Sequence, residues 1–326
     1  MSKAARPPRV VCGLLVVVAT FALASCSGEQ VDDAASTGAP TTAVTGSTAP
    51  DAGTDCRDEP VGPVTYRYAD RPGSDPALTS LDVYLPAGCG PVPVVVWVHG
   101  GGWRAGDKAN ASTAPKVAWA NQLGAALVAM NYRLSTPGAG VVWPDHSDDV
   151  AAGLAWIASD GPALGLDPAD VVLLGHSAGA HLVTLAVTNP GLVDAAGLGD
   201  GVRCVVALDS ASYDLASSRA NERGLVANAF GTDPEVLATA SPLVQARRAG
   251  VVDTPMLVVT RGPATWREAA TVFVDALNAG GGRAELVDVS PYDHNEAGRQ
   301  LGVEGEELLT VPVTRFVEGC LGSLAS

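Results

Sequence analysis

Basic residues are scarce in this chain. Lys and Arg together number 20 against 35 Asp and Glu, so the formal net charge at pH 7 is −15. Lys3, Arg6 and Arg9 lie at the very beginning of the chain, which leaves the remainder more acidic still. Nucleic acids and anionic lipid surfaces attract clusters of positive charge, so this balance argues against direct contact with either. The charge says little about a small-molecule substrate.

The first 25 residues have the organisation of an export signal. The basic residues precede an apolar stretch over 10–24, which is too short and too close to the terminus for a comfortable transmembrane span. Leu23-Ala24-Ser25-Cys26 then places a cysteine directly after small residues, and this pattern resembles a bacterial lipobox. The resemblance implies cleavage before Cys26, a diacylglyceryl group on its sulfur and a position at the outer face of the cell membrane. The alternatives are an ordinary secretory signal and a retained anchor helix.

A low-complexity stretch follows the signal. Residues 26–55 are rich in Ser, Thr, Ala, Gly, Pro and Asp and show no apolar periodicity, so they cannot bury enough surface to fold. We therefore expect a lipoprotein signal peptide over 1–25, a disordered tether over 26–55 and a folded domain over 56–326. The chain is 47% hydrophobic, which is enough to build a large core.

The cysteines lack the spacing of a metal site. No C-x-x-C pair occurs, and no histidine spacing supports zinc. Beyond Cys12 and Cys26, an even set of four remains, which in an exported protein favours disulfides. Of the three possible connectivities we favour the one that ties the start of the fold to an early loop and the last helix to a strand. These pairs are Cys56 with Cys89 and Cys204 with Cys320.

Apolar runs alternate with amphipathic stretches along the folded domain. Strands are expected at 64–68, 81–85, 93–98, 125–132, from 171, at 202–208, 256–259 and 284–289, with helices at 114–123, 149–159, from 178 and at 269–277. This alternation predicts an α/β fold with a mostly parallel central sheet flanked by helices. Residues 210–252, between the sixth and seventh strands, contain no clear strand. They are interpreted as a small cap over the site or as a plain surface insertion.

A G-x-S-x-G motif follows one of the buried strands. Gly175-His176-Ser177-Ala178-Gly179 stands between an apolar run and small residues that can begin a helix. This pattern is typical of a sharp turn that exposes a serine hydroxyl, and the two glycines would avoid collisions in so tight a turn. Ser177 is therefore the candidate nucleophile.

A second glycine motif follows an earlier strand. His99-Gly100-Gly101-Gly102-Trp103 comes directly after the apolar run over 93–98. Glycines free backbone N–H groups to point into a cleft, as an oxyanion hole requires. We expect the amides of Gly101 and Gly102 to act as donors together with the amide of Ala178.

These motifs carry a resemblance to known enzymes. The segments concerned are HGGGW at 99–103, NYRL at 131–134, WP at 143–144, DDV at 148–150, Trp156, GLDP at 165–168 and GHSAGAH at 175–181. Together they resemble the α/β-hydrolase fold esterases, and within these the hormone-sensitive-lipase-like and feruloyl-esterase-like enzymes. The likeness runs from about Val64 to Val317, is specific in its middle third and becomes looser after Ser210.

The resemblance also indicates the general base. α/β-Hydrolases carry their triad in the order Ser, acid, His, and His294 alone follows Ser177 at a distance, directly after the last expected strand. The family carries its base at this place. The other histidines receive structural interpretations: His181 as a packing or pocket residue, His99 and His176 as parts of the two glycine motifs, and His146 as part of a surface-like loop.

The acid is where the chain departs from the family. Related esterases usually place an Asp a few residues after the strand at 256–259, where this chain has Thr265. We favour Asp209, at the carboxyl end of the preceding strand, because pancreatic-type lipases take their acid from the same place. Asp214 is the first alternative. Glu268 is the second, although it also fits a helix capping box with Thr265.

The resulting hypothesis is a carboxylesterase-like serine hydrolase acting on a small-molecule ester, without a metal or organic cofactor. Ser177 would attack, His294 would transfer the proton and Asp209 would orient His294. A formamide or an arylamide remains open as the substrate. One rival is a surface lipoprotein that keeps the hydrolase fold but binds a ligand or partner without turnover, a reading that the missing usual Asp supports. The other is a cell-envelope acyltransferase with the same acyl-enzyme.

Overall fold

The computed structural model describes residues 56–220, 222–262 and 264–321. The expected signal peptide, the lipidation site at Cys26 and the tether lie outside these residues. No helix within the described ranges is long and apolar enough to span a bilayer.

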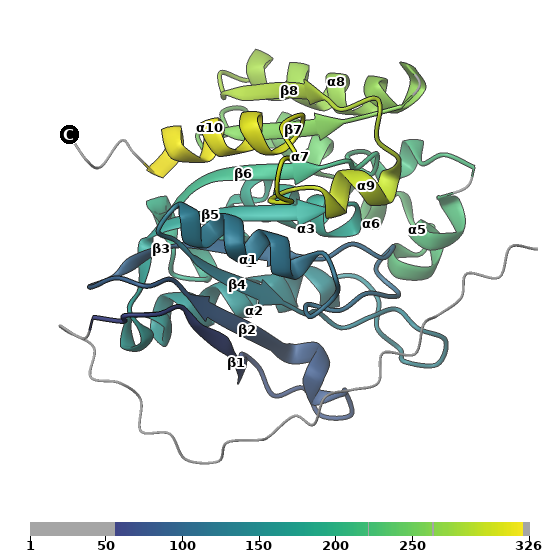
Figure 1. Ribbon diagram of the computed structural model, residues 1–326. Helices are drawn as coiled ribbons and strands as arrows, with labels where there is room; N and C mark the ends of the chain where they lie inside the picture. The colour runs from purple at the N-terminus through teal and green to yellow at the C-terminus, as the bar shows by residue number, and fades with distance from the viewer. Residues whose placement is uncertain (1–55, 221, 263, 322–326) are drawn as a thin grey trace, which may run out of the picture. The chain divides into compact units, whose positions relative to one another are not determined.

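The core of the fold is an eight-stranded sheet in the order β1-β2-β4-β3-β5-β6-β7-β8 (Figure 1). The strands are β1 (Val61–Arg67), β2 (Ser80–Leu85), β3 (Val92–Val98), β4 (Ala126–Met130), β5 (Leu166–His176), β6 (Val202–Leu208), β7 (Met256–Thr260) and β8 (Ala284–Asp288). The pairs of β1 with β2 and of β2 with β4 are antiparallel, and every other pair is parallel. The predicted α/β class with a mostly parallel sheet is confirmed.

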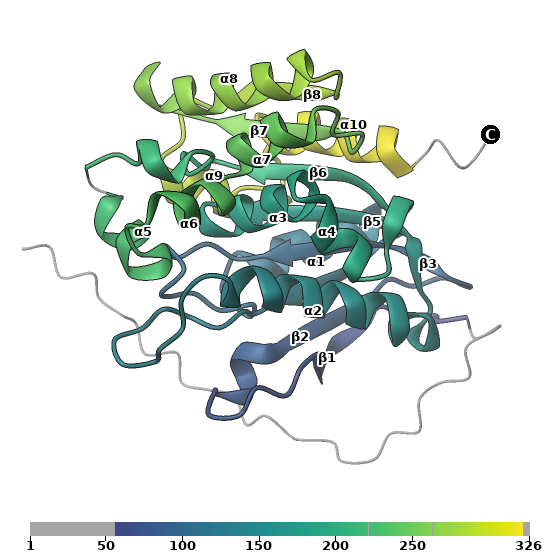
Figure 2. The ribbon, with the colours of Figure 1, turned by 180° about the vertical axis from the view of Figure 1, so that it is seen from behind.

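Helices cover both faces of the sheet. They are α1 (Thr113–Gln122), α2 (Asp145–Ser159), α3 (Ala178–Thr188), α4 (Pro190–Ala195), α5 (Arg223–Phe230), α6 (Pro234–Thr239), α7 (Pro242–Ala249), α8 (Ala264–Ala279), α9 (His294–Arg299) and α10 (Thr310–Leu321), with 3-10 turns η1 (Pro76–Thr79), η2 (Gly161–Leu164), η3 (Gly199–Gly201) and η4 (Leu215–Ser217). Helices α1, α9 and α10 lie on the face toward the viewer in Figure 1. Helices α2, α3, α4 and α7 lie on the face seen in Figure 2.

Strand β3 shows why two helical layers are needed. Its side chains alternate between two buried clusters: Val94, Val96 and Val98 pack on the α2 and α3 side, whereas Val95 and Trp97 pack on the α1 and α10 side. A strand buried on both faces reads as a continuous apolar run, as residues 93–98 do. The sheet is therefore covered by helices on both faces in its centre.

The segment between β6 and β7 is divided between two roles. Helix α7 packs against α3 and α8 and buries Leu243 and Ala246 in the main core. The chain just before and within α5 instead faces a cavity through Glu222 and Leu225. The part of the segment that faces the cavity is thus limited to residues 210–212 and the neighbourhood of α5, because the apolar stripe of α7 belongs to the core layer.

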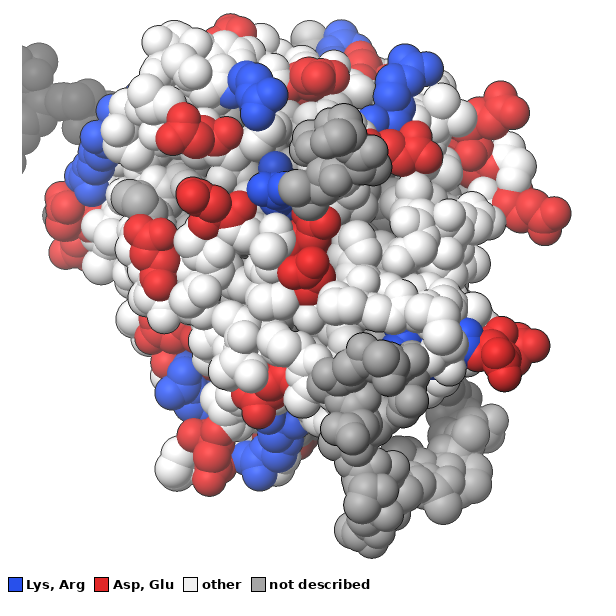
Figure 3. Space-filling model, turned by 90° about the vertical axis from the view of Figure 1, so that its left-hand side faces the viewer, with Lys and Arg blue, Asp and Glu red and all other residues white. Residues whose placement is uncertain are grey.

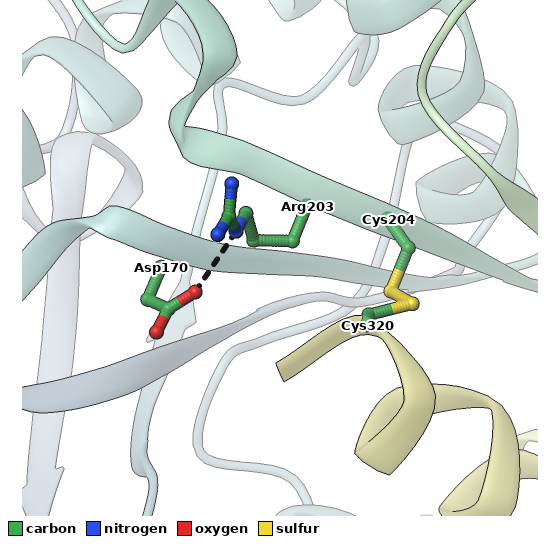
Figure 4. The surroundings of a disulfide bond; sticks show 4 residues. All are labelled: Asp170, Arg203, Cys204 and Cys320. Atoms are coloured by element: carbon green, nitrogen blue, oxygen red, sulfur yellow. Dashed lines mark hydrogen bonds and ion pairs between the residues drawn. A yellow bond between two sulfur atoms is a disulfide. The ribbon is translucent and has the colours of Figure 1, made fainter. Parts of the chain in front are cut away.

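Both predicted disulfides are present. Cys56 bonds Cys89, and Cys204 at the start of β6 bonds Cys320 in α10 (Figure 4). Beside the second bond, Arg203 Nε donates to Asp170 Oδ1 at 3.0 Å and ties β6 to β5. On the face turned to the viewer in Figure 3, which is the left side of Figure 1, the basic side chains are interspersed with acidic ones.

The start of β5 was predicted at 171 and lies at Leu166, and the starts of two helices were also predicted wrongly. Helix α2 begins at Asp145 rather than at 149, so His146 lies inside a helix and is fully buried instead of occupying a surface loop. Helix α8 begins at Ala264 rather than at 269, so Thr265 stands within the helix and is not its capping residue. In both cases tertiary packing extends a helix through residues whose own pattern carries no clear periodicity.

Candidate active site

Ser177 occupies a tight elbow between β5 and α3. Its backbone has φ 54° and ψ −116°, a region that is rarely populated by residues other than glycine and costs roughly 1–3 kcal/mol. A Cβ on Gly175 would overlap the backbone of Gly179, and a Cβ on Gly179 would overlap the carbonyl oxygen of Val98. Glycine is therefore required at both places, as the G-x-S-x-G motif predicts.

Ser177, His294 and Asp209 form one hydrogen-bonded chain. The hydroxyl of Ser177 lies 2.9 Å from His294 Nε2, and His294 Nδ1 lies 2.6 Å from Asp209 Oδ2. Because an ionised carboxylate can only accept, Nδ1 carries the proton and Nε2 is free to accept from the Ser177 hydroxyl. The Asp209 side chain is 2% exposed, whereas that of His294 is 36% exposed. The imidazole thus joins a buried carboxylate to a serine at the surface of a cavity.

The carboxyl ends of neighbouring strands bring these side chains together. Ser177 follows β5 and Asp209 follows β6, which pairs with β5 in parallel. His294 is the first residue of α9, and a capping box fixes this helix start: Asp293 accepts from the Glu296 amide while the Glu296 carboxylate accepts from the Asp293 amide. Residues distant in sequence therefore meet at one edge of the sheet, where ligands bind in such folds.

A cavity of about 680 Å³ opens over this chain of hydrogen bonds. Gly101, Gly102 and Ala178, the expected oxyanion donors, line the same cavity as Ser177 and His294. Gly101 has φ 125° and a Cβ there would overlap Ala105, so only glycine fits this bend. The two glycine motifs thus meet in space, as the sequence predicts.

Of the remaining histidines, His99, His146 and His181 are buried, whereas His176 is half-buried and lines the cavity. Burial lowers the pKa of His181 to about 4 and that of His146 to about 4, so both are neutral at pH 7. His181 accepts from the Trp103 indole at its Nδ1 and donates from Nε2 to the Ala240 carbonyl, which confirms its interpretation as a packing residue. Burial, with a smaller contribution from the charge on His294, lowers the pKa of His176 to about 3. His294 remains as the histidine that reaches Ser177.

The three candidate acids lie in different surroundings. Asp209 accepts from His294, as described. Asp214 instead caps the turn η4, where it accepts from the Ala216 amide and the Ser217 hydroxyl. Glu268 lies exposed on α8. Geometry thus singles out Asp209 among the residues that the sequence proposed.

Sequence reasoning missed Arg261, which contacts the candidate acid. It follows β7 directly, and its Nε donates to Asp209 Oδ2 at 2.6 Å, the same oxygen that accepts from His294. The sequence contained one signal for such a residue, since the usual Asp after β7 is absent. A change at this place implies that the residues after β7 have a different relation to the acid of the site. Among the described residues, no group of His, Cys, Asp and Glu is arranged to hold a metal ion.

The mostly parallel sheet with its serine elbow defines an α/β-hydrolase fold. The BD-FAE family matches residues 81–259, more than half of the 326-residue chain, and the chain belongs to this family. The matched range includes both glycine motifs, Ser177 and Asp209, and it ends before Arg261 and His294.

Two curated relatives carry ester-hydrolase names. The chain is 38% identical over 101 residues to the probable carboxylic ester hydrolase LipM of Mycobacterium tuberculosis, which covers 31% of this chain and 22% of that protein. It is 28% identical over 242 residues to the probable isoprenylcysteine alpha-carbonyl methylesterase ICMEL2 of Arabidopsis thaliana, covering 66% of this chain and 54% of the relative. The chain therefore spans about half or less of the length of these relatives.

Solved esterase structures share the fold. Thermogutta terrifontis esterase 2 phosphonylated by sarin superposes with a TM-score of 0.66 at 22% identity, over 80% of this chain and 96% of that one. The native form of this esterase gives a TM-score of 0.64 at 22% identity, over 81% and 92%. At this level of identity the likeness carries the fold alone, and it confirms the predicted α/β-hydrolase fold.

Proposed function

We propose that this protein hydrolyses carboxylic esters through an acyl-enzyme on Ser177. The observation that carries the proposal is the unbroken hydrogen-bond chain from the Ser177 hydroxyl through His294 to Asp209, opening into a cavity lined by the glycine loop. A serine hydroxyl needs an adjacent base, and the base needs an orienting group. A binding protein without turnover has no physical need for all three contacts together.

The proposed reaction has two halves. Ser177 Oγ attacks the ester carbonyl carbon while its proton passes to His294 Nε2, and the amides of Gly101, Gly102 and Ala178 hold the negative oxygen. The carbon–oxygen bond of the ester then breaks, and the alcohol leaves with the proton from His294. A water molecule attacks the acyl-enzyme with the same proton transfers, releasing the acid and restoring Ser177.

The substrate class rests on two supports. The names of the curated relatives, a carboxylic ester hydrolase and a methylesterase, point to esters of small molecules. The cavity of about 680 Å³ is of the size that holds a small ligand. We therefore propose a small-molecule carboxylic ester, with no metal or organic cofactor needed for the steps above.

The test is hydrolysis of p-nitrophenyl acetate and butyrate by the protein and by Ser177→Ala. Turnover should fall to background in Ser177→Ala and stay unchanged in Ser159→Ala, whose serine lies at the end of α2, away from the site. A fluorophosphonate probe should label the parent and not Ser177→Ala. Absence of both turnover and labelling in the parent would overturn the proposal and favour a binding role. Ester products formed with an added alcohol acceptor would instead indicate acyl transfer.

We also propose that the domain is exported and anchored by a lipid on Cys26. The lipobox-like sequence supports this, as do two disulfides in the folded part, because disulfides persist mainly in oxidising compartments. Expressed in a bacterial host with radioactive palmitate, the protein should incorporate label and sediment with membranes. Cys26→Ala should lose both properties. Unlabelled, secreted parent protein would contradict the anchor.

A further inference from the structure

One oxygen of the buried Asp209 is shared by two partners. His294 Nδ1 and Arg261 Nε each lie 2.6 Å from Asp209 Oδ2. The Asp209 side chain is 2% exposed and that of Arg261 is 13% exposed, so little water screens this contact. A guanidinium is charged at every pH at which the protein folds, whereas the imidazole gains and loses its proton. The Asp209 carboxylate therefore faces the permanent positive charge of Arg261 and a second positive charge that His294 carries only when it is protonated.

Arg261 is itself held in place by an aromatic ring. Its guanidinium lies 4.6 Å from the ring centre of Trp266, and the guanidinium of Arg219 lies 4.2 Å from the same ring. Arg219 also donates to the carbonyl of Thr265. This stack of Arg219, Trp266 and Arg261 joins the chain before α5, the start of α8 and the end of β7. A cation held over an indole by packing keeps its direction toward Asp209.

We infer that Arg261 is a positioning residue that fixes the Asp209 carboxylate and sets the pH at which His294 can act as base. This inference rests on the proposed function. Arg261 offsets part of the negative charge that would otherwise favour protonated His294. The base therefore stays neutral, and able to accept the Ser177 proton, down to a lower pH than an unshared carboxylate would allow.

Other charged and titratable groups near His294 do not reproduce this effect. They are His176 at the end of β5, Lys116 in α1, Glu222 before α5, Asp293, which caps α9, and Glu296 and Arg299 within α9. His176 is held by donating to the His294 backbone carbonyl, and Lys116 contacts the far end of α9 at the Gly298 carbonyl. Arg261 is the cation in hydrogen-bond contact with the acid itself.

The alternative is that Arg261 only neutralises a buried carboxylate for the sake of folding. A purely structural role would lower the amount of folded protein, or activity at every pH alike, without moving the pH profile. The acid limb of kcat/KM reports protonation of the free enzyme's base, so it distinguishes the two roles.

The experiment compares pH profiles of ester hydrolysis by the full chain and by Arg261→Met, Arg261→Gln and Arg261→Lys. Both neutral variants should shift the midpoint of the acid limb upward by about one pH unit, a tenfold change in the protonation equilibrium. Arg261→Gln keeps a donor and serves if Arg261→Met does not fold. Arg261→Lys keeps the charge, so its midpoint should stay near that of the parent while kcat falls, because an ammonium lacks the fixed fork and the stacking plane.

Arg203→Met is the matched control, since Arg203 Nε also contacts a largely buried carboxylate, that of Asp170, but does not line the active-site cavity. Its acid limb should coincide with that of the parent. An unshifted or lowered midpoint in folded Arg261→Met or Arg261→Gln would overturn the inference, as would an equal shift in Arg203→Met. A parent without Ser177-dependent turnover would refute the proposed function instead, so the two failures are distinguishable.

Discussion

Replacing Asp209 by Asn tests the proposed acid with almost no change of shape. The side chain is 2% exposed, so water cannot take the place of the lost charge. The amide oxygen can still accept from His294 Nδ1 and Arg261 Nε, but it offers no negative charge to the imidazolium that forms as Ser177 attacks. The positive charge of Arg261 is then uncompensated and lies beside that imidazolium.

The size of the effect follows from Coulomb's law. Charge centres about 4 Å apart, at an effective dielectric constant of about 20, interact by about 4 kcal/mol. If the transition state loses this interaction energy, kcat decreases by about 10³-fold. The corresponding Asp→Asn change in other Ser-His-Asp enzymes costs about 10⁴-fold, where a wrong tautomer adds to the loss.

The assay measures kcat and KM for p-nitrophenyl butyrate in Asp209→Asn, Asp214→Asn and Glu268→Gln. Asp214 caps η4 and Glu268 is exposed on α8, so these two variants should stay within about twofold of the parent, as is usual for changes away from the reacting groups. Circular dichroism checks that all three fold. A loss in Asp209→Asn smaller than about tenfold, or an equal loss in either control, would refute the assignment.

Two further predictions concern stability. Burial lowers the pKa of Lys116 from 10.5 to about 7. Between these two pH values the unfolded chain keeps a proton on Lys116 that the folded chain has lost. The free energy of unfolding should therefore rise with pH above pH 7, by up to about 1.4 kcal/mol per pH unit. Urea unfolding at pH 7, 8 and 9 should show this rise in the parent and a flatter curve in Lys116→Met. The Cys204–Cys320 bond closes a loop with a sequence separation of 116. Replacing both cysteines by Ala should lower the free energy of unfolding by about 5 kcal/mol, because the unfolded chain gains the entropy of that loop. A loss below about 1 kcal/mol would contradict this loop-entropy argument.

The elements that a local pattern determines could be read from the sequence. Strand β6 begins at Val202 and ends at Leu208 as predicted, because a short, mostly apolar run between turn residues has few alternatives. The two glycine motifs could also be recognised in the sequence. In the G-x-S-x-G motif, for example, Gly175 and Gly179 are required by contacts within the motif and with the neighbouring strand. The disulfide pairing followed from topology, as Cys204 and Cys320 lie on elements that pack together.

Features that depend on side chains distant in the sequence could not be predicted in the same way. His146 stands in an acidic stretch, yet it is buried against Phe230, 84 positions further along the chain, in a cluster that only the folded chain assembles. Arg261 looks like an ordinary turn residue after β7. Its role depends on β6 and β7 being neighbours in the sheet, which places its side chain beside Asp209.

The position of the acid and the identity of Arg261 are parts of one arrangement. Strand β6 pairs with β5, so Asp209 stands one strand closer to Ser177 than a residue after β7 would. The usual position of an acid after β7 is occupied by Thr265, which carries no charge. With the carboxylate moved to β6, the end of β7 is free to supply a cation, and Trp266 from α8 holds that cation in place. The missing family Asp is thus not evidence of a lost triad, because the same edge of the sheet carries the carboxylate on one strand and its counter-charge on the next.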